Sequence, residues 1–280
     1  MLRKGLTLAA LGLALIAGSA QAATTHLEPK DVHWSFEGPF GKFDQAQLQR
    51  GYKVYREVCS ACHSMNLMYF RNLGQKGGPF YDEKYPNPND NPYVKALAKD
   101  IQVKDIDSET GDQISRPATS ADKFPAPFPN EAAARASNGG ALPPDLSVIA
   151  KARDGGPRYL YSLLTGYEPA PAGLTVPPGK AYNPYFPGDL TAQWHGKGPV
   201  PEGGLIGMPF QLTDGRVTFD DGHSAKSADE AKDIVAYLVW ASDPHQTERK
   251  QIGLSVILYL LLLAGVVYAS YRRIWRRIEH

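Results

Sequence analysis

Cysteine is scarce in this chain, because its 280 residues contain only Cys59 and Cys62, both within one short motif. No cysteine remains to form a structural disulfide elsewhere, so stability must come from core packing and a buried cofactor. Strand patterns are weak and no internal repeat is visible. The chain is therefore predicted to be mainly α-helical. Its 27 glycines and 23 prolines predict long ordered loops around few helices.

The two cysteines belong to the run Cys59-Ser60-Ala61-Cys62-His63, which is the attachment signature of a c-type haem. On one helical turn the two thiols share a face, so both can add to one porphyrin, and His63 then lies under the iron. A zinc site would need two more soft ligands, but the other histidines are scattered. A redox dithiol would favour a preceding strand, whereas residues 43–55 predict a helix with Asp44 as its N-cap.

The N-terminus has the pattern of a secretory signal. Arg3 and Lys4 precede an apolar stretch, and Ala20-Gln21-Ala22 provides a cleavage site, so residues 1–22 are predicted to be removed. Export agrees with haem attachment, which takes place outside the cytoplasm. We therefore expect residues 23–248 to form one periplasmic haem domain.

A second hydrophobic run lies near the C-terminus and predicts a membrane anchor at residues 249–271. It includes 19 uncharged residues, 252–270, or about 28 Å of helix against a hydrocarbon thickness of roughly 30 Å. The tail 272–280 carries four arginines, so the positive-inside rule predicts a cytoplasmic C-terminus in a bacterial inner membrane. A buried core helix is the alternative, but the segment is apolar on all sides.

Periodicity and capping residues predict the other elements. A capping box is expected from Ser227 to Glu230, at the start of the last helix before the anchor. A short β hairpin is expected around residues 216–219, between two turn signals. The expected helices are residues 44–58, 91–100, 130–137, 145–152, 156–165 and 227–242.

An electron-transfer haem needs a second axial ligand, and methionine is the common choice. Met65 and Met68 follow the motif too closely to reach the opposite face of the ring. Met208 remains, in a loop where a glycine permits close approach and a proline stiffens the chain. His195 and His223 are competing ligands, and either would give a bis-histidine haem of lower potential.

Haem propionates favour arginine, tyrosine or backbone donors. Arg153 and Tyr159 flank the turn Asp154-Gly155-Gly156-Pro157 and are suitably spaced to supply them. A solvated arginine and a packed aromatic are the alternative for this pair.

Further stretches match a single family pattern over nearly the whole mature chain. With the haem motif, they resemble the cytochrome c1 family, the membrane-anchored haem subunits of cytochrome bc1 complexes. The stretches are residues 34–38 with Phe40-Gly41, 49–59, 141–147, 162–167, 183–188, 206–209 and the helix before the anchor.

The resemblance implies a class I cytochrome c-like haem domain, mainly α, with one C-terminal transmembrane helix. It implies one haem c attached covalently through Cys59 and Cys62. It also implies roles for further residues: His63 and Met208 as iron ligands, Arg153 and Tyr159 at the propionates, and Asn138, Pro143 and Pro144 lining the haem pocket.

The same resemblance implies an electron path and a set of partners. Ubiquinol is oxidised at cytochrome b, and one electron passes through the Rieske iron-sulfur protein to this haem, then to a soluble or membrane-bound cytochrome c. The subunit itself breaks no substrate bond, so only the complex is a ubiquinol–cytochrome c reductase. A dimeric complex is implied as well.

One stretch departs from the family pattern. Residues 188–204 resemble an insertion between a Phe-Pro-Gly motif and the methionine loop, which are directly joined in mitochondrial relatives. The insertion is expected to contact the Rieske head, to form another partner surface or to be a tolerated surface loop. The disulfide that some bacterial members have is absent.

Charge predicts electrostatic partners and gives no reason to expect nucleic acid. Residues 23–248 hold 22 Lys and Arg against 28 Asp and Glu, a net charge of −6, which should attract a basic partner. The segment 82–112 is the most acidic, and it includes Asp105, Asp107 and Glu109. We consider it either a cytochrome c docking site or a solvated loop.

Two other functions remain open from the residues alone. A membrane-tethered carrier or haem-bearing redox sensor would act outside any quinol complex, and would not copurify with cytochrome b and a Rieske protein. An oxidase or peroxidase domain would need an open iron position, which would be reported by carbon monoxide binding.

Overall fold

Two crossing helices, α2 (Gln45–Glu57) and α6 (Ser227–Ser242), form the centre of the computed structural model, which describes residues 26–276. The carboxylate of Asp44 caps α2 by accepting the Ala46 amide at 3.0 Å, which confirms the predicted N-cap. The helices approach closely at Gly51, where a β-carbon would lie only 2.1 Å from the Asp233 carbonyl oxygen. Glycine is therefore required at this crossing. The predicted signal segment, residues 1–22, lies outside the described residues.

The packed faces of the two helices bury a cluster of aromatic rings. Tyr55 stacks on Tyr237 at 6.0 Å between ring centroids, and Tyr237 lies 5.6 Å from Trp240. Helix α5 (Gly156–Thr165) packs against α6 as a third core element. Burial of such large rings supplies most of the stabilisation available to a domain without disulfides.

The interior of the α2–α6 crossing also contains charge. The Arg50 guanidinium donates to the Asp233 carboxylate at 2.8 Å, and the Asp233 side chain is only 2% exposed. Burial raises the pKa of Asp233, and the hydrogen bond and charge of Arg50 oppose this rise. The pairing makes the crossing specific, because removing Arg50 would leave the buried Asp233 carboxylate with only Gln47 and His223 nearby.

The predicted capping box at the start of α6 is wrong. The Ser227 amide donates to the Asp214 carboxylate at 2.8 Å, and no side chain of Ser227 or Lys226 caps the helix. Glu230 instead turns inward and accepts the Val217 amide at 2.9 Å. Burial raises the pKa of Glu230, although the Val217 amide opposes that rise.

The remaining helical elements are short, and two of them, α3 (Pro92–Lys99) and α4 (Glu131–Ser137), lie where the sequence predicts helices, at residues 91–100 and 130–137. The predicted helix at residues 145–152 is wrong: this segment forms turns, because the Asp145 carboxylate takes up the Ser147 amide and the chain then enters a Gly-Gly-Pro turn. The other short elements are η1 (Cys59–Ala61), η2 (Phe70–Gly74) and η3 (Pro88–Asp90).

Four short strands form two antiparallel hairpins. One pairs β1 (Gln102–Ile106) with β2 (Gln113–Pro117), and the other pairs β3 (Ala181–Asn183) with β4 (Gly204–Ile206). The hairpin predicted at residues 216–219 is wrong, since the Val217 amide bonds to the Glu230 side chain instead of to a partner strand. The mainly helical class with small hairpins is confirmed.

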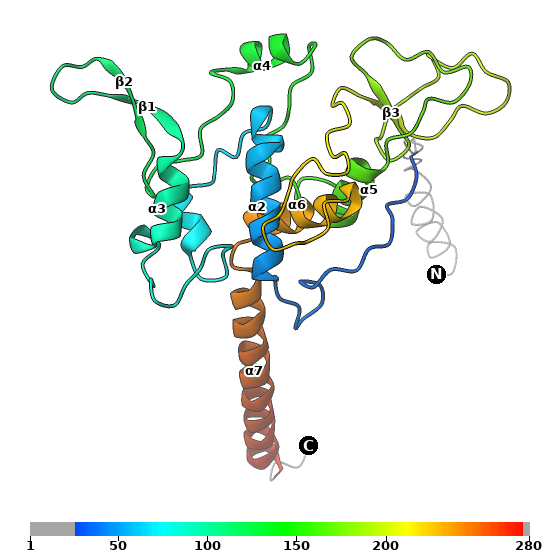
Figure 1. Ribbon diagram of the computed structural model, residues 1–280. Helices are drawn as coiled ribbons and strands as arrows, with labels where there is room; N and C mark the ends of the chain where they lie inside the picture. Colours follow the sequence, from blue (N-terminus) through cyan, green and yellow to red (C-terminus); the bar gives the residue numbers. More distant parts are fainter. Residues whose placement is uncertain (1–25, 277–280) are drawn as a thin grey trace, which may run out of the picture.

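Helix α7 (Gln246–Trp275) extends alone from the body of the domain (Figure 1). Its most apolar 18-residue window has a mean hydropathy of 2.4, and none of that window is buried. The helix is therefore long and apolar enough to cross a membrane. Only residues 243–245 separate it from α6. The Lys250 ammonium donates to the Phe36 carbonyl at 2.6 Å, and Arg249 pairs with Asp243, so polar contacts hold the start of α7 against the domain.

Candidate haem site

The Cys-x-x-Cys-His motif begins directly after α2, at the end of that helix turned away from α7 (Figure 1). The amides of Cys62 and His63 both donate to the Cys59 carbonyl, at 3.1 and 2.9 Å, so the motif folds as a tight turn. Burial raises the pKa of Cys59 to about 12, and the neighbouring Cys62 adds to this effect. A redox dithiol needs a lowered thiol pKa, so this environment does not suit one.

The His63 ring is oriented by a backbone carbonyl. Its Nδ1 lies 2.8 Å from the carbonyl oxygen of Pro144, which can only accept, so Nδ1 carries the proton. Burial lowers the pKa of His63, although the Pro144 hydrogen bond and Asp145 oppose this shift. The imidazole is therefore held neutral with Nε2 free to bind a metal, as in iron ligation by histidine.

The loop that carries Pro144 is fastened to the motif by Asp145. Its carboxylate accepts the Asn66 amide at 2.7 Å, the Ser64 hydroxyl at 2.8 Å and the Ser147 amide at 2.8 Å. Burial raises the pKa of Asp145, but these hydrogen bonds outweigh it and leave the pKa below its ordinary value. Asp145 thus positions the chain on both sides of the His63–Pro144 contact.

Met208 lies in a loop that continues from β4 and reaches the same region. A β-carbon on Gly207 would lie 2.8 Å from the Ala141 side chain, so this loop touches the segment that leads to Pro144. The Tyr167 hydroxyl donates to the Met208 carbonyl at 2.9 Å. The structure therefore brings the Met208 loop against the segment whose Pro144 carbonyl contacts His63.

The other candidate ligands lie elsewhere. Met65 is fully buried and Met68 is 3% exposed, both within the main hydrophobic core. His223 faces Asp233 at 3.7 Å beside the α2–α6 crossing, and His195 is exposed in the β3–β4 connection. These positions favour Met208 among the sulfur and imidazole groups that the sequence offers.

The predicted propionate residues occur together. Tyr159 is buried on α5, and burial raises its pKa, while the nearby Arg153 charge opposes the rise. The Arg153 side chain is exposed and donates to the neighbouring Ala152 carbonyl. Tyr159 also lies near enough to Tyr167 to contribute to the raised pKa of Tyr167, for which burial is the main cause. Tyr159 thus lies near Tyr167, the residue whose hydroxyl contacts the Met208 carbonyl.

Asn138 has a local structural contact in addition to its predicted role. Its side-chain amide nitrogen donates to the Ala134 carbonyl at 2.7 Å at the end of α4. Its main-chain carbonyl accepts the Ala141 amide at 3.1 Å. Asn138 therefore begins the turn that leads to Pro143 and Pro144. Pro143 is half-buried and Pro144 is exposed.

The departure at residues 188–204 forms the connection between β3 and β4. Leu190 and Trp194 from this connection pack with Leu174 and Tyr182 in a small second hydrophobic cluster. The Tyr182 hydroxyl donates to the Glu202 carbonyl at 2.7 Å. The stretch is thus an ordered part of the hairpin that delivers Met208.

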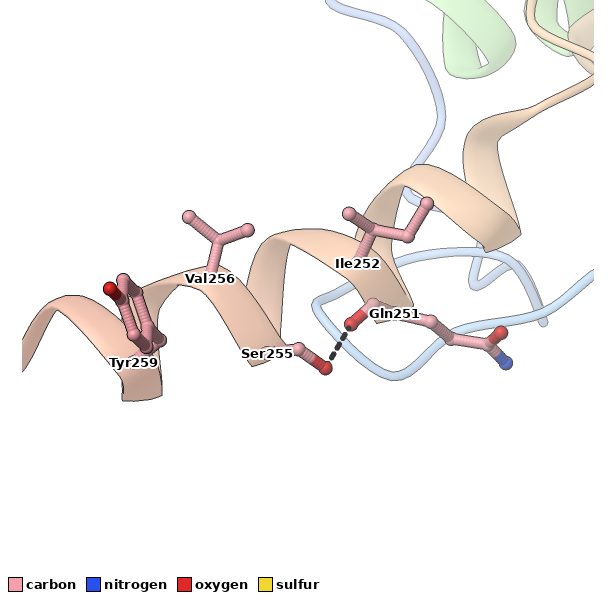
Figure 2. A pocket seen from close by; sticks show the side chains of 5 residues that line it. All are labelled: Gln251, Ile252, Ser255, Val256 and Tyr259. Atoms are coloured by element: carbon pink, nitrogen blue, oxygen red, sulfur yellow. Dashed lines mark hydrogen bonds between the residues drawn. The ribbon is translucent and has the colours of Figure 1, made fainter.

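Within residues 26–276, a surface hollow away from the motif lies on α7. This shallow hollow of about 380 Å³ is lined by Gln251, Ile252, Ser255, Val256 and Tyr259 of that single helix; Figure 2 shows these side chains. Its one polar contact drawn is the Ser255 hydroxyl on the Gln251 carbonyl at 3.2 Å. Between residues 26 and 276, no group of three or more His, Cys, Asp or Glu residues is placed to hold a metal ion.

Two residues that position the candidate haem site, Asp145 and Tyr167, were not assigned a role from the sequence. Asp145 is followed two residues later by Ser147, a spacing that signals a carboxylate accepting a nearby backbone amide. Tyr167 follows the glycine that ends α5, and nothing in its local pattern indicates that its hydroxyl would bond to a residue 41 positions away. Such distant pairings require the fold.

Comparisons with known proteins agree with this geometry. Residues 34–278 match the model of the cytochrome C1 family. The chain is 40% identical to cytochrome c1 of Rhodospirillum rubrum, over 98% of this chain and 97% of that protein. It is 42% identical to mitochondrial cytochrome c1-2, heme protein, of Solanum tuberosum, over 94% of this chain and 91% of that one. It is also 40% identical to cytochrome b/c1 of Bradyrhizobium diazoefficiens, spanning 40% of that longer protein.

Proposed function

The chain belongs to the cytochrome c1 family, and from this premise we propose how its residues carry out the electron transfer of a cytochrome bc1 complex. Haem c is its cofactor, and Cys59 and Cys62 are the cysteines available to attach it. The chain is the electron-transfer subunit that receives an electron from the Rieske protein and delivers it to a cytochrome c. Cytochrome b and the Rieske protein are its partners in the membrane.

The proposed iron ligands are His63 and Met208. The contact between His63 Nδ1 and the Pro144 carbonyl, at 2.8 Å, is the observation that carries this proposal, because it presents Nε2 in the neutral form that binds iron. A thioether as the second ligand favours a high potential. Haem supplies a one-electron carrier that changes charge without making or breaking a substrate bond.

The surrounding residues fit the porphyrin in chemical type. Arg153 offers an exposed cation and Tyr159 a buried hydroxyl beside it, a donor set suited to propionate carboxylates. Asn138 shapes the turn into Pro143 and Pro144, and those prolines present an apolar edge and a carbonyl. We infer that these five residues hold the cofactor and exclude water from it.

We also propose a membrane topology for the chain. Residues 1–22 are inferred to be a signal peptide, 23–248 the periplasmic haem domain, 249–271 the anchor and 272–280 the cytoplasmic basic tail of a bacterial inner-membrane protein. The arginines after the apolar run support this orientation. We further infer a dimeric complex in which this subunit carries electrons and performs no catalysis by itself.

The acidic segment 82–112 is the proposed docking site for a basic cytochrome c. It covers η3, α3, β1 and the turn that leads to β2, and the β1–β2 hairpin projects from the body of the domain (Figure 1). Asp105 pairs with Arg116, and Asp107 accepts the Glu109 amide at 2.8 Å, so some of its charge also serves the hairpin itself. Neutralising all three carboxylates should lower the association rate and its salt dependence.

Optical spectra of detergent-extracted membranes test the proposed ligands. Wild type should show the weak near-infrared band of a ferric iron–thioether bond, and Met208→Leu should lose it while keeping its covalent haem. Carbon monoxide should then bind the reduced variant and not the wild type. A wild-type spectrum without the band would point to a histidine ligand or an open iron, as in a sensor or an oxidase.

Met68→Leu is a matched control, since it removes a thioether that lies in the core, 3% exposed. It should retain the band. Copurification with cytochrome b and a Rieske protein separates a complex subunit from a free carrier.

A further inference from the structure

Tyr167 contacts the Met208 loop on both sides of Pro209. Its hydroxyl donates to the Met208 carbonyl at 2.9 Å, and its ring lies 5.3 Å from the Phe210 ring. Tyr167 itself follows α5, which packs on the core helix α6. A donor on a fixed part of the fold therefore holds the main chain of the predicted iron ligand.

The hydrogen-bonded ladder between β3 and β4 ends before Met208 and does not hold its main chain. Its last pair joins Ala181 to Ile206, two residues before Met208. Pro209 has no amide hydrogen and can donate no bond of its own. The Tyr167 hydroxyl thus acts at the point where backbone pairing has ended.

We propose that Tyr167 is a positioning residue that keeps Met208 on the haem iron, an inference that rests on the ligation proposed above. In this inference, Met208 leaves the iron by a shift of its loop, in which the hydroxyl–carbonyl bond is lost. The bond therefore stabilises only the ligated state, and its removal moves the equilibrium toward the open one. An external ligand that competes with Met208 measures that equilibrium directly.

Imidazole titration of the ferric holoprotein, in the extracted full-length complex, provides the test. Tyr167→Phe removes the hydroxyl and keeps the ring against Phe210, so the domain should fold and attach haem normally. Loss of one such hydrogen bond should tighten apparent imidazole binding about fivefold. The near-infrared band, present without imidazole, should disappear at correspondingly lower concentrations.

Tyr182→Phe is the matched control, because it deletes another tyrosine hydroxyl that donates to a carbonyl of the same connection, at Glu202. It should leave imidazole affinity within about twofold of wild type. Phe210→Leu keeps the hydroxyl bond and removes the ring contact, and it should also stay within about twofold.

The outcomes separate this inference from the function on which it rests. Equal imidazole affinity in wild type and Tyr167→Phe, with the near-infrared band present in both, would overturn the inference and leave the proposed ligation intact. Equal tightening in Tyr182→Phe or Phe210→Leu would overturn it too, because the hydroxyl would then have no special role. A wild-type protein without the band would overturn both.

Discussion

The two loops that meet at the haem site are fastened by different kinds of interaction. The His63 side is held by the Asp145 carboxylate, which accepts three hydrogen bonds, and by the Pro144 carbonyl. The Met208 side is held by neutral hydroxyl–carbonyl bonds and a three-residue ladder. Charge-assisted hydrogen bonds are about twice as strong as neutral ones. We therefore expect the histidine side to persist while the methionine side yields first.

Removing the histidine breaks the stronger side outright and should have the largest effect. In His63→Leu, we expect the low-spin haem spectrum to disappear and ubiquinol–cytochrome c reductase activity of membranes to fall to background, because no other imidazole lies at the motif. His195→Leu, at an exposed histidine, should behave as wild type. A low-spin spectrum in His63→Leu would contradict the proposed ligand.

Weakening the Asp145 contacts should have the next largest effect. Asp145→Asn keeps the shape but removes the charge, and hydrogen bonds to charged groups contribute about 1.5 to 3 kcal/mol, so we expect a loss of about 2 kcal/mol in unfolding free energy. Denaturant unfolding of the holoprotein, followed by haem absorbance, measures this.

Asp107→Asn offers a matched comparison, since Asp107 also accepts backbone amides, but at an exposed hairpin turn. Its cost should stay below about 1 kcal/mol. Equal losses in the two variants would show that Asp145 has no special place in the haem site.

The same carboxylate predicts a pH dependence. Because the pKa of Asp145 is lower in the folded chain than in the unfolded one, its contribution is complete above the unfolded value of about 4 and is lost as pH falls through the folded value. The stability difference between wild type and Asp145→Asn should thus shrink between pH 7 and pH 3. An unchanged difference at pH 3 would contradict a role for the ionised group.

The smallest effect is expected on the methionine side, in the small hydrophobic cluster beside the β3–β4 hairpin. Trp194→Ala removes a half-buried ring from the small cluster around Leu174, Tyr182 and Leu190. Amide hydrogen exchange in β4 should accelerate about tenfold through local opening, while the amides at Asn66 and Ser147 should exchange as in wild type. Equal acceleration at both places would mean that the two sides unfold as one unit.

Much of this site follows from local sequence. The cysteine spacing, Asp44 as a cap and the long apolar run each depend on residues a few positions apart, and the structure confirms the cap and the long helix. The errors at Ser227, at residues 145–152 and at residues 216–219 share one cause. In each case a carboxylate bonded to a backbone amide and replaced the pattern that local rules predict, and two of these bonds join residues 13 positions apart.

The contacts at the start of α7 also have a kinetic consequence. Three residues connect α6 to α7, and Lys250 donates to the Phe36 carbonyl. This short, bonded connection should restrict how far the domain can reorient relative to α7. With α7 as a membrane anchor, the haem is expected to stay at a fixed distance from the membrane surface and to diffuse only in the plane of the membrane. We therefore expect movement of the partners, and not of this subunit, to close the distance between donor and acceptor.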